Sequence, residues 1–179
     1  MSTAQLAGGA SGTGSMTVQA PNTNSNQTVT IPDATGTVMV SGNMPAFSAY
    51  PSGTQSISSG VYTKVACNTK EFDTANAFDA TTNYRFTPQV AGYYQVNGAI
   101  SPNGTSTGSA VAAIYKNGSA FKYGPYIQTT NANSSVSALI YLNGSTDYIE
   151  MYAYVTASVA SIGNGASSTY FQASLVRAA

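Results

Sequence analysis

The sequence predicts an all-β protein, a sandwich or jelly roll of about eight to ten strands. Three observations support this class. Apolar and polar residues alternate with the period of a strand in most of the chain after residue 15, and turn residues separate the alternating runs. No window has the i, i+3, i+4, i+7 spacing of an amphipathic helix. The length of 179 residues fits one ordinary domain with an appendage. A domain of that size needs neither a disulfide nor a metal to fold.

Residues 1–14 consist mostly of Gly, Ala, Ser and Thr, a composition that buries too little apolar area to order alone. We expect a flexible tether or a peptide that orders on another protein. The segment lacks the basic and apolar regions of a signal peptide. The protein is therefore expected to be made in a cytoplasm and not exported through a signal peptide.

Residues 15–42 are predicted to form a short β-stem. Two alternating runs flank the turn sequence Pro-Asp-Ala-Thr-Gly at 32–36. Two or three short strands with one apolar face are not stable alone in water. The apolar side chains should therefore meet the same segment of sister chains. These candidate interface residues are Val29, Ile31, Val38 and Val40.

Residues 43–179 are predicted to form the head domain, where strand-like runs recur with turn signals between them. Asn117-Gly118 is a strong hairpin signal, and Asn143-Gly144 separates two further runs. The run after Gly144 places Met151 and its neighbours on one face and an uncharged aromatic stripe on the other. Such a stripe is more often a subunit interface than a ligand site. Its residues are Tyr148, Tyr152 and Tyr154.

Charge is scarce: 7% of residues are charged, and six basic side chains balance six acidic ones. Without a basic excess, we expect no nucleic acid as partner. No Lys/Arg-rich amphipathic stretch and no apolar run of about 20 residues predicts membrane insertion. Hydrophobic residues make up 42% of the chain, which argues against disorder. A net charge near zero favours association, so an oligomer is expected.

Few residues could carry chemistry. The chain has no histidine and one cysteine, which excludes a Ser-His-Asp apparatus and a His-ligated or thiolate zinc site within one chain. We therefore expect no enzyme and no cofactor. Cys67 alternates with Val61, Thr63 and Val65 in a predicted strand, so it is expected to be a buried small hydrophobe.

Three carboxylates lie close together in sequence, at Glu71, Asp73 and Asp79. Two carboxylates could hydrolyse a glycosidic bond, but acids in a loop between strands are more often solvated surface. They are weak candidates for a calcium site across a trimer, because a hard cation needs several oxygen ligands and a loop of acids and amides can offer them.

Exposed tyrosine and amide side chains are typical of contacts with carbohydrate or protein. The loop region after the Asn117-Gly118 hairpin is rich in both. The candidate receptor contacts there are Tyr123, Tyr126, Gln128, Asn131 and Asn133.

Several residues of the head recur at distinctive spacings: Phe47-Ser48-Ala49, Tyr62, Val65, Asn68, Phe86, Pro88, Gly92 and Tyr94. With them, the segment Pro45–Val176 resembles the globular head of complement component 1, q subcomponent, and its tumour-necrosis-factor-like relatives. The resemblance implies a ten-strand jelly roll that assembles as a compact homotrimer. It also implies that Phe78, Phe86 and Tyr94 are core residues.

The stretch "MTVQAPNTNSNQTVTIPDATGTVMVSG" resembles a stem repeat of bacteriophage tail and head fibre proteins, with a match over residues 14–42. There is one repeat and no long shaft, which favours a short fibre, a tip or a capsid-attached spike. The resemblance implies a virion location and a virion protein as partner for the N-terminus.

Three function classes follow. The leading hypothesis is a non-enzymatic phage virion protein, a short trimeric fibre or spike whose head binds a host-surface glycan or protein. Within that class, a capsid decoration or head fibre protein is the alternative. A bacterial trimeric adhesin or spore-surface protein is the second class. The third, a depolymerase, is disfavoured by the absence of histidine and the scarcity of acids.

Overall fold

The computed structural model describes residues 24–26, 28, 38–40, 42, 44–104, 108–128 and 132–179. The chain divides into two units, Met1–Gly36 and Thr37–Ala179, and each is considered by itself. The first unit is described only at residues 24–26 and 28, none of which belongs to a strand or a helix.

The predicted stem strand is not present at its described residues. Residues 38–40 adopt no strand, and Val38 and Val40 are 79% and 56% exposed. Val29 and Ile31 lie outside the described residues, so their predicted role stays a prediction.

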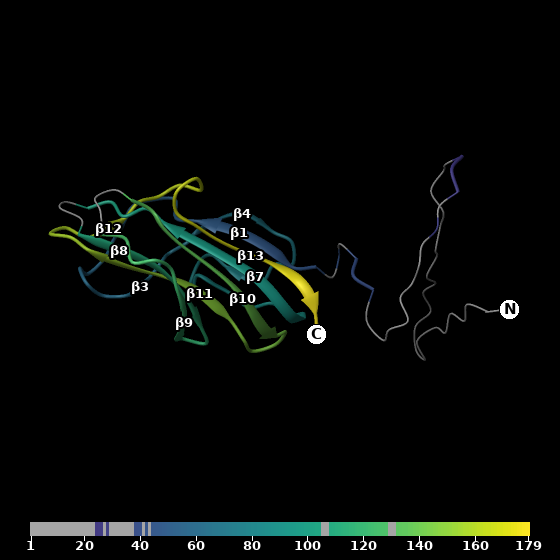
Figure 1. Cartoon of the computed structure of the whole chain (residues 1–179). Coiled ribbons are helices and arrows are strands. Elements are labelled where there is room, and N and C mark those ends of the chain that lie inside the picture. Colours follow the sequence, from purple (N-terminus) through teal and green to yellow (C-terminus); the bar gives the residue numbers. More distant parts are fainter. Residues whose placement is uncertain are drawn as a thin grey trace. The chain divides into compact units, whose positions relative to one another are not determined.

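Two antiparallel sheets pack face to face as a β-sandwich (Figure 1). This confirms the predicted fold class. The first sheet has the order β10 (Ser134–Asn143), β7 (Ala91–Ile100), β13 (Tyr170–Ala178), β1 (Ala46–Tyr50) and β4 (Thr69–Asp73). The second has the order β5 (Phe78–Asp79), β6 (Arg85–Phe86), β11 (Ile149–Thr156), β8 (Ser109–Lys116) and β9 (Ser119–Tyr123), and β3 (Thr63–Lys64) also pairs with β11.

A small ladder joins β12 (Ser161–Ile162) to β2 (Gln55–Ser56). The strand order crosses repeatedly between the two sheets, since β7 lies in the first sheet and β8 in the second, and β10 returns to the first. Among the described residues there is no helix with the length and apolarity needed to span a bilayer.

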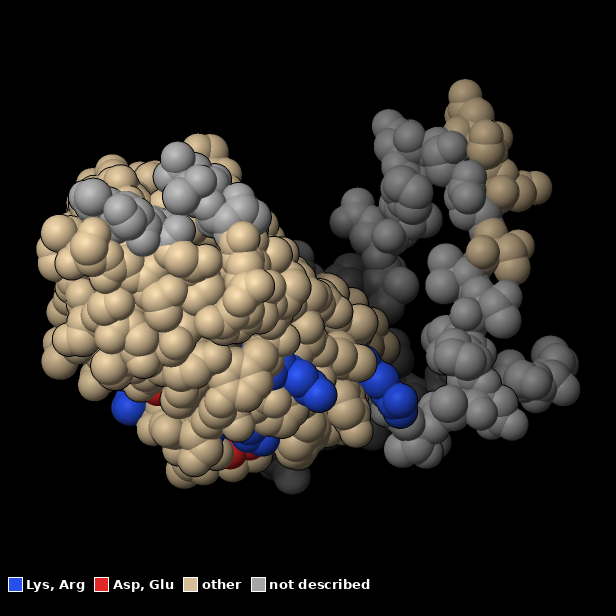
Figure 2. All heavy atoms as spheres, turned by 60° about the vertical axis from the view of Figure 1, so that its left-hand side comes forward, with Lys and Arg blue, Asp and Glu red and all other residues tan. Residues whose placement is uncertain are grey.

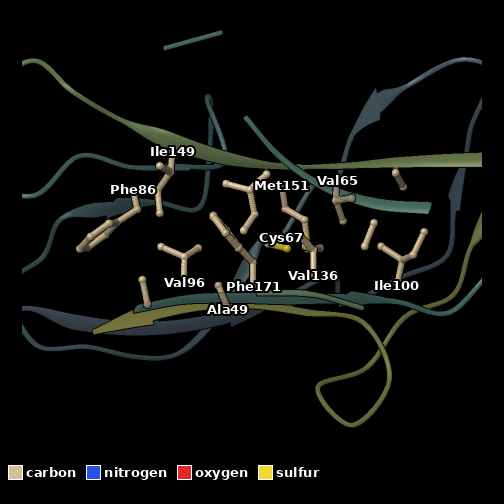
Figure 3. Packing of buried hydrophobic residues seen from close by; sticks show 14 of the residues in the cluster. Ala49, Val65, Cys67, Phe86, Val96, Ile100, Val136, Ile149, Met151 and Phe171 are labelled. Atoms are coloured by element: carbon tan, nitrogen blue, oxygen red, sulfur yellow. The ribbon is translucent and has the colours of Figure 1, made fainter. Parts of the chain in front are cut away.

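The core fills the space between the sheets with alternate residues of each long strand (Figure 3). Along β10, buried and exposed residues alternate without exception. Phe47 lies at the centre of an aromatic group, stacked on Phe78 and Phe86 with ring centroids 4.6 and 4.5 Å apart. The predicted core residues Phe86 and Tyr94 are fully buried, and Phe78 is 3% exposed.

The region around Cys67 differs from its prediction. Only Thr63–Lys64 forms a strand there, and Val61 is 52% exposed. The backbone N–H of Cys67 donates to the carbonyl of Val65, two residues earlier, which closes a tight turn and ends the strand pattern. The prediction that Cys67 is buried is nevertheless confirmed, with 1% of the residue exposed.

Two Asn-Gly pairs make different connections. Asn117 and Gly118 have φ angles of 53° and 77° and join β8 to β9, which confirms the predicted hairpin. Asn143 instead ends β10 in one sheet, and Gly144 begins the connection to β11 in the other. Gly144 has a φ of 70°, and a Cβ there would lie 2.3 Å from the backbone nitrogen of Ala91. This connection between the sheets therefore requires glycine.

Candidate functional site

Six tyrosines gather on the outer face of the second sheet, and we call them the tyrosine cluster. Their rings form a connected set, with centroid separations from 3.8 Å to 6.4 Å. The tightest pair, Tyr115 and Tyr152, is stacked at 3.8 Å with an interplanar angle of 18°. The members are Tyr62, Tyr115, Tyr123, Tyr126, Tyr152 and Tyr154.

Small residues beneath the rings explain why the cluster forms. On β8, Val111 and Ala113 are 3% and 0% exposed, yet they do not belong to the core between the sheets. Val111 is paired with Tyr154, and Ala113 is paired with Tyr152 on one side and Tyr123 on the other. Because Val111 and Ala113 have short side chains, the neighbouring tyrosine rings can extend over them and contact one another.

The tyrosine cluster is uncharged. Burial raises the pKa of Tyr62, and the neighbouring phenols raise it further. Burial likewise raises the pKa of Tyr115 and Tyr152. These three phenols therefore remain neutral well above physiological pH. The nearest ion pair on this face joins Lys64 to the buried Glu150, which precedes Tyr152 on β11, so the two charges neutralise each other.

The cluster brings together residues from two predicted surfaces. Tyr123 and Tyr126, predicted as receptor contacts, lie beside Tyr152 and Tyr154, predicted as a subunit interface. Tyr123 and Tyr126 are 55% and 56% exposed, so they present the accessible edge of the cluster. The sequence analysis did not predict a contact role for Tyr62 or Tyr115.

The remaining predicted contacts lie apart from these rings. Tyr148 packs under the guanidinium of Arg85, 4.4 Å from ring centre to Cζ. Gln128 and Asn133 are exposed, and Asn131 lies outside the described residues. The hydroxyl of Ser109 donates to the Tyr126 hydroxyl at 2.8 Å, which ties the loop after β9 to the sheet.

A second exposed surface lies on the outer face of the first sheet, and we call it the apolar patch. Its four side chains are 42% to 60% exposed. Tyr93 and Tyr141 are cross-strand partners on β7 and β10 whose rings meet edge to face at 5.5 Å. A hollow of about 260 Å³ adjoins them, lined in part by Arg177. The patch consists of Tyr93, Leu139, Tyr141 and Val176.

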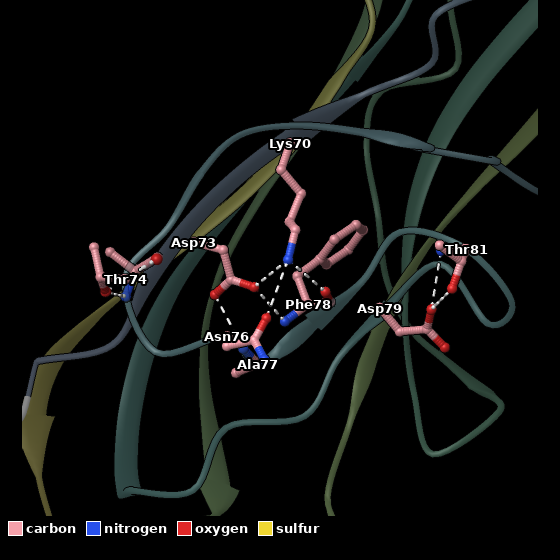
Figure 4. Close-up of polar contacts among 9 residues, drawn as sticks. Lys70, Asp73, Thr74, Asn76, Ala77, Phe78, Asp79 and Thr81 are labelled. Carbon is pink, nitrogen blue, oxygen red and sulfur yellow. Dashed lines mark hydrogen bonds and ion pairs between the residues drawn. The ribbon is translucent and has the colours of Figure 1, made fainter.

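The predicted cation ligands do not converge on one point (Figure 4). Asp73 pairs with Lys70 and accepts from the N–H groups of Ala77 and Phe78. Asp79 turns away from them and accepts from the N–H groups of its own loop.

Glu71 accepts from the Ser48 hydroxyl on β1 instead. Within the described residues, no three Asp, Glu, Cys or His side chains are close enough together to hold a metal ion. Glu71, Asp73 and Asp79 therefore form no calcium site within the described part of one chain, and a site shared across a trimer stays a prediction. Each carboxylate is committed to stabilising its own turn or strand edge.

Asp79 makes the stability of the fold depend on pH in the acid range. Hydrogen bonds from the N–H groups of Thr82 and Thr81 and from the Asn83 side chain hold the pKa of Asp79 well below its usual range. In the unfolded chain an aspartate titrates near pH 4. Because the folded pKa is lower, the stabilisation is complete above about pH 5 and is lost as pH falls below about 4. At the alkaline end, burial raises the pKa of Cys67 and Tyr94 to about 12 each.

We therefore predict a melting temperature that is flat from pH 5 to pH 8 and falls on both sides. Stability should decline above about pH 9, because the unfolded thiol and phenol ionise there while the buried ones do not. Thermal melts from pH 2 to pH 11 measure this. Asp79→Asn should reduce the fall in melting temperature at low pH and leave the fall at high pH unchanged. A transition inside the flat region would contradict the prediction, since the chain has no histidine.

No protein-family model matches the chain, and no curated protein matches it by sequence. Solved structures do match it. Murine APRIL at pH 5.0 aligns with a TM-score of 0.58 at 10% identity, over 74% of this chain and 99% of that one. The globular domain of zebrafish complement 1qA aligns with a TM-score of 0.55 at 15% identity, over 75% and 98%. The chain has the jelly-roll fold of C1q- and TNF-like domains.

The same C1q/TNF-like fold occurs in a virion protein. Vertex protein P5 of PRD1 aligns with a TM-score of 0.54 at 17% identity, over 74% of this chain and 73% of that one. At these identities the likeness concerns the fold. None of the matches supports the fibre-type stem repeat of residues 14–42.

Proposed function

We propose that the protein is a non-enzymatic virion protein of a phage, a trimeric spike or short fibre whose head binds a host-surface glycan. The observation that carries the binding role is the tyrosine cluster, a ring-lined and uncharged surface on the outer face of the second sheet. The virion role is supported by the fold shared with the vertex protein of PRD1, and by the resemblance of residues 14–42 to a fibre stem. That match favours a capsid-attached spike over a tail fibre.

A glycan fits the tyrosine cluster better than an apolar protein surface does. Sugar rings present C–H faces edged by hydroxyl groups, and tyrosine offers a ring face beside a hydroxyl that donates and accepts. The phenols of Tyr62, Tyr115 and Tyr152 stay protonated, because burial raises each pKa. Rings also supply contact area at low conformational entropy, which suits recognition by a rigid sheet.

The apolar patch supplies the assembly surface in this proposal. Domains of the C1q/TNF type usually form trimers. Leu139 and Val176 are 57% and 60% exposed beside two tyrosine rings, and an exposed apolar patch of this kind marks an interaction site. With the apolar patch covered by sister chains, the tyrosine cluster on the opposite sheet stays accessible. Three copies would then raise the apparent affinity by about 10²–10⁴ without further contacts.

The N-terminal segment would attach this assembly to the particle. We propose that residues 1–14 bind another virion protein and that residues 15–42 connect them to the head. A capsid decoration or head fibre protein has the same parts and differs in its position. Antibody against residues 43–179 should label purified particles, and particles that remain unlabelled would contradict the virion role.

Binding to an array of bacterial surface glycans tests the tyrosine cluster. The labelled full-length chain should bind a subset of glycans, and Tyr123→Ala and Tyr152→Ala should each weaken that binding about tenfold or more, as loss of an aromatic anchor does. Phe72→Ala is the matched control, since this ring is 50% exposed on β4 of the other sheet. Absence of any glycan binding, or equal binding by all variants, would overturn the proposed site.

A further inference from the structure

A surface pocket of about 570 Å³ lies beside the second sheet, between the turn that follows β4 and the strand β6. Its volume is within the range of small-ligand sites. The pocket lining has both polar and apolar groups, and its polar part combines two cations with side-chain amides. The two cations are Lys70 and Arg85, and the amides belong to Asn76, Asn83 and Gln89.

The Arg85 guanidinium is available to a ligand. Its cross-strand partners are two acids, Asp79 on β5 and Glu150 on β11. Each acid is already committed, since Asp79 accepts from its own loop and Glu150 pairs with Lys64. Within the described part of the chain, no acceptor is hydrogen-bonded to the guanidinium, which stacks over the Tyr148 ring. Stacking on Tyr148 fixes the plane of the guanidinium group and leaves its N–H groups able to donate hydrogen bonds to a ligand.

The pocket lining carries two cations, Lys70 and Arg85, and one anion, Asp79. Asp79 lines it, but five hydrogen bonds from Thr81, Thr82 and Asn83 use its oxygens. The Lys70 ammonium contacts Asp73, Asn76 and the carbonyl of Phe78 at the pocket wall, so it is fixed in place. The planar Arg85 guanidinium in the same lining matches a carboxylate, which a guanidinium binds through two parallel hydrogen bonds.

Arg85 connects the pocket to the strand that carries part of the tyrosine cluster, because it pairs with Glu150 on β11 and its guanidinium stacks on Tyr148. Tyr148 precedes β11, and Tyr152 and Tyr154 lie on the same outward face of it, separated by the paired Glu150. Four residues of extended chain span about 13 Å. Figure 2 shows that most of the visible surface is uncharged and that the charged atoms gather along one side of it. A saccharide that stacks on Tyr152 can extend along β11 toward Arg85, which pairs with this strand.

We propose that the Arg85 pocket binds the carboxylate of an acidic sugar residue in the same saccharide whose neutral residues stack on the tyrosine cluster. This inference rests on the proposed glycan-binding function and specifies the class of glycan. The Arg85 guanidinium forms the paired hydrogen bonds to the carboxylate. The amides of Asn83 and Gln89 face the hydroxyl groups of the same sugar.

The test compares matched polysaccharides. Oligomers that contain glucuronic, galacturonic or sialic acid, and the carboxyl-reduced form of each, are titrated against the full-length chain. The native protein should prefer at least one acidic form about tenfold, as expected for charge-assisted hydrogen bonds. Arg85→Gln should abolish this preference and leave affinity for the reduced form unchanged. Arg85→Lys should restore only part of it, because an ammonium lacks the planar fork.

Lys122→Gln is the control for general electrostatic attraction, since Lys122 is exposed on β9 and does not line the pocket. It should keep the preference. Equal binding of acidic and reduced forms by the native protein would overturn the inference and leave glycan binding intact. A preference that survives in Arg85→Gln would do the same. Failure to bind any glycan would instead overturn the proposed function itself.

Discussion

Replacing Leu139 with arginine is expected to convert the assembled protein into a monomer. Leu139 is 57% exposed and adjoins the hollow that Tyr93 and Val176 line on the first sheet. In the proposed trimer a neighbouring chain covers this side chain. A guanidinium buried there without a partner costs several kcal/mol at each copy of the interface. Light scattering of the full-length chain at micromolar concentration should report a trimer for the native protein and a single chain for the variant.

Two further variants locate the interface. Ser119→Arg adds the same charge at an exposed position on β9 and should leave the trimer intact. Tyr152→Arg places it in the tyrosine cluster, the other candidate interface, and should also leave the trimer intact while it weakens glycan binding. Dissociation by Tyr152→Arg and not by Leu139→Arg would assign the interface to the tyrosines. A native chain that is monomeric would reject both surfaces.

The elements that sequence could predict are those decided by local alternation. Along β7, β11 and β13, apolar residues recur at every second position, so the buried face can be read without knowing the neighbours. The Asn117-Gly118 hairpin is equally local, because both residues adopt the positive φ that this pair favours. Burial of Cys67 follows from its size and polarity even though the strand predicted around it is not formed.

The two surfaces depend on strand order, which alternation does not specify. Tyr62 meets Tyr154 because β3 pairs with β11, and no local pattern marks that pairing. Tyr115 could have been suspected, since it alternates with the core residues Ala112 and Ile114 on β8. The apolar patch likewise unites β7, β10 and β13, which are neighbours in the sheet and far apart in the chain.

The arrangement of the three carboxylates within one chain also depends on more than closeness in sequence. Closeness in sequence made Glu71, Asp73 and Asp79 candidates for one cation site. The pairing of β4 with β1, however, shifts register between Ser48 and Ala49, opposite the position of Glu71. Glu71 contacts β1, whereas Asp73 caps the following turn. The carboxylate of Asp79 is occupied by the backbone of its own loop. Each carboxylate therefore makes its hydrogen bonds with a different neighbouring strand or turn, and the three do not converge on one ligand within the chain.

Truncating Phe47 to alanine is expected to destabilise the fold by about 3–5 kcal/mol, the usual cost of removing a buried phenylalanine ring. Phe47 is 1% exposed, and its ring contacts Phe78, Phe86 and Phe171 at centroid distances of 4.5 to 5.1 Å. These rings come from β1, β5, β6 and β13, so Phe47 joins both sheets. Small domains are stable by about 5–15 kcal/mol in total. Urea denaturation at one fixed protomer concentration measures the loss.

Phe72→Ala separates ring packing from the mere loss of a phenyl group. Phe72 lies on β4, across the ladder from Ser48, and is 50% exposed, so its truncation removes little buried area. It should cost less than about 1 kcal/mol, as surface substitutions do. Both variants are best compared in the Leu139→Arg background, where dissociation does not add to unfolding. Similar losses for the two would show that the three-ring contact of Phe47 adds nothing beyond its hydrophobicity, and would contradict its central place in the core.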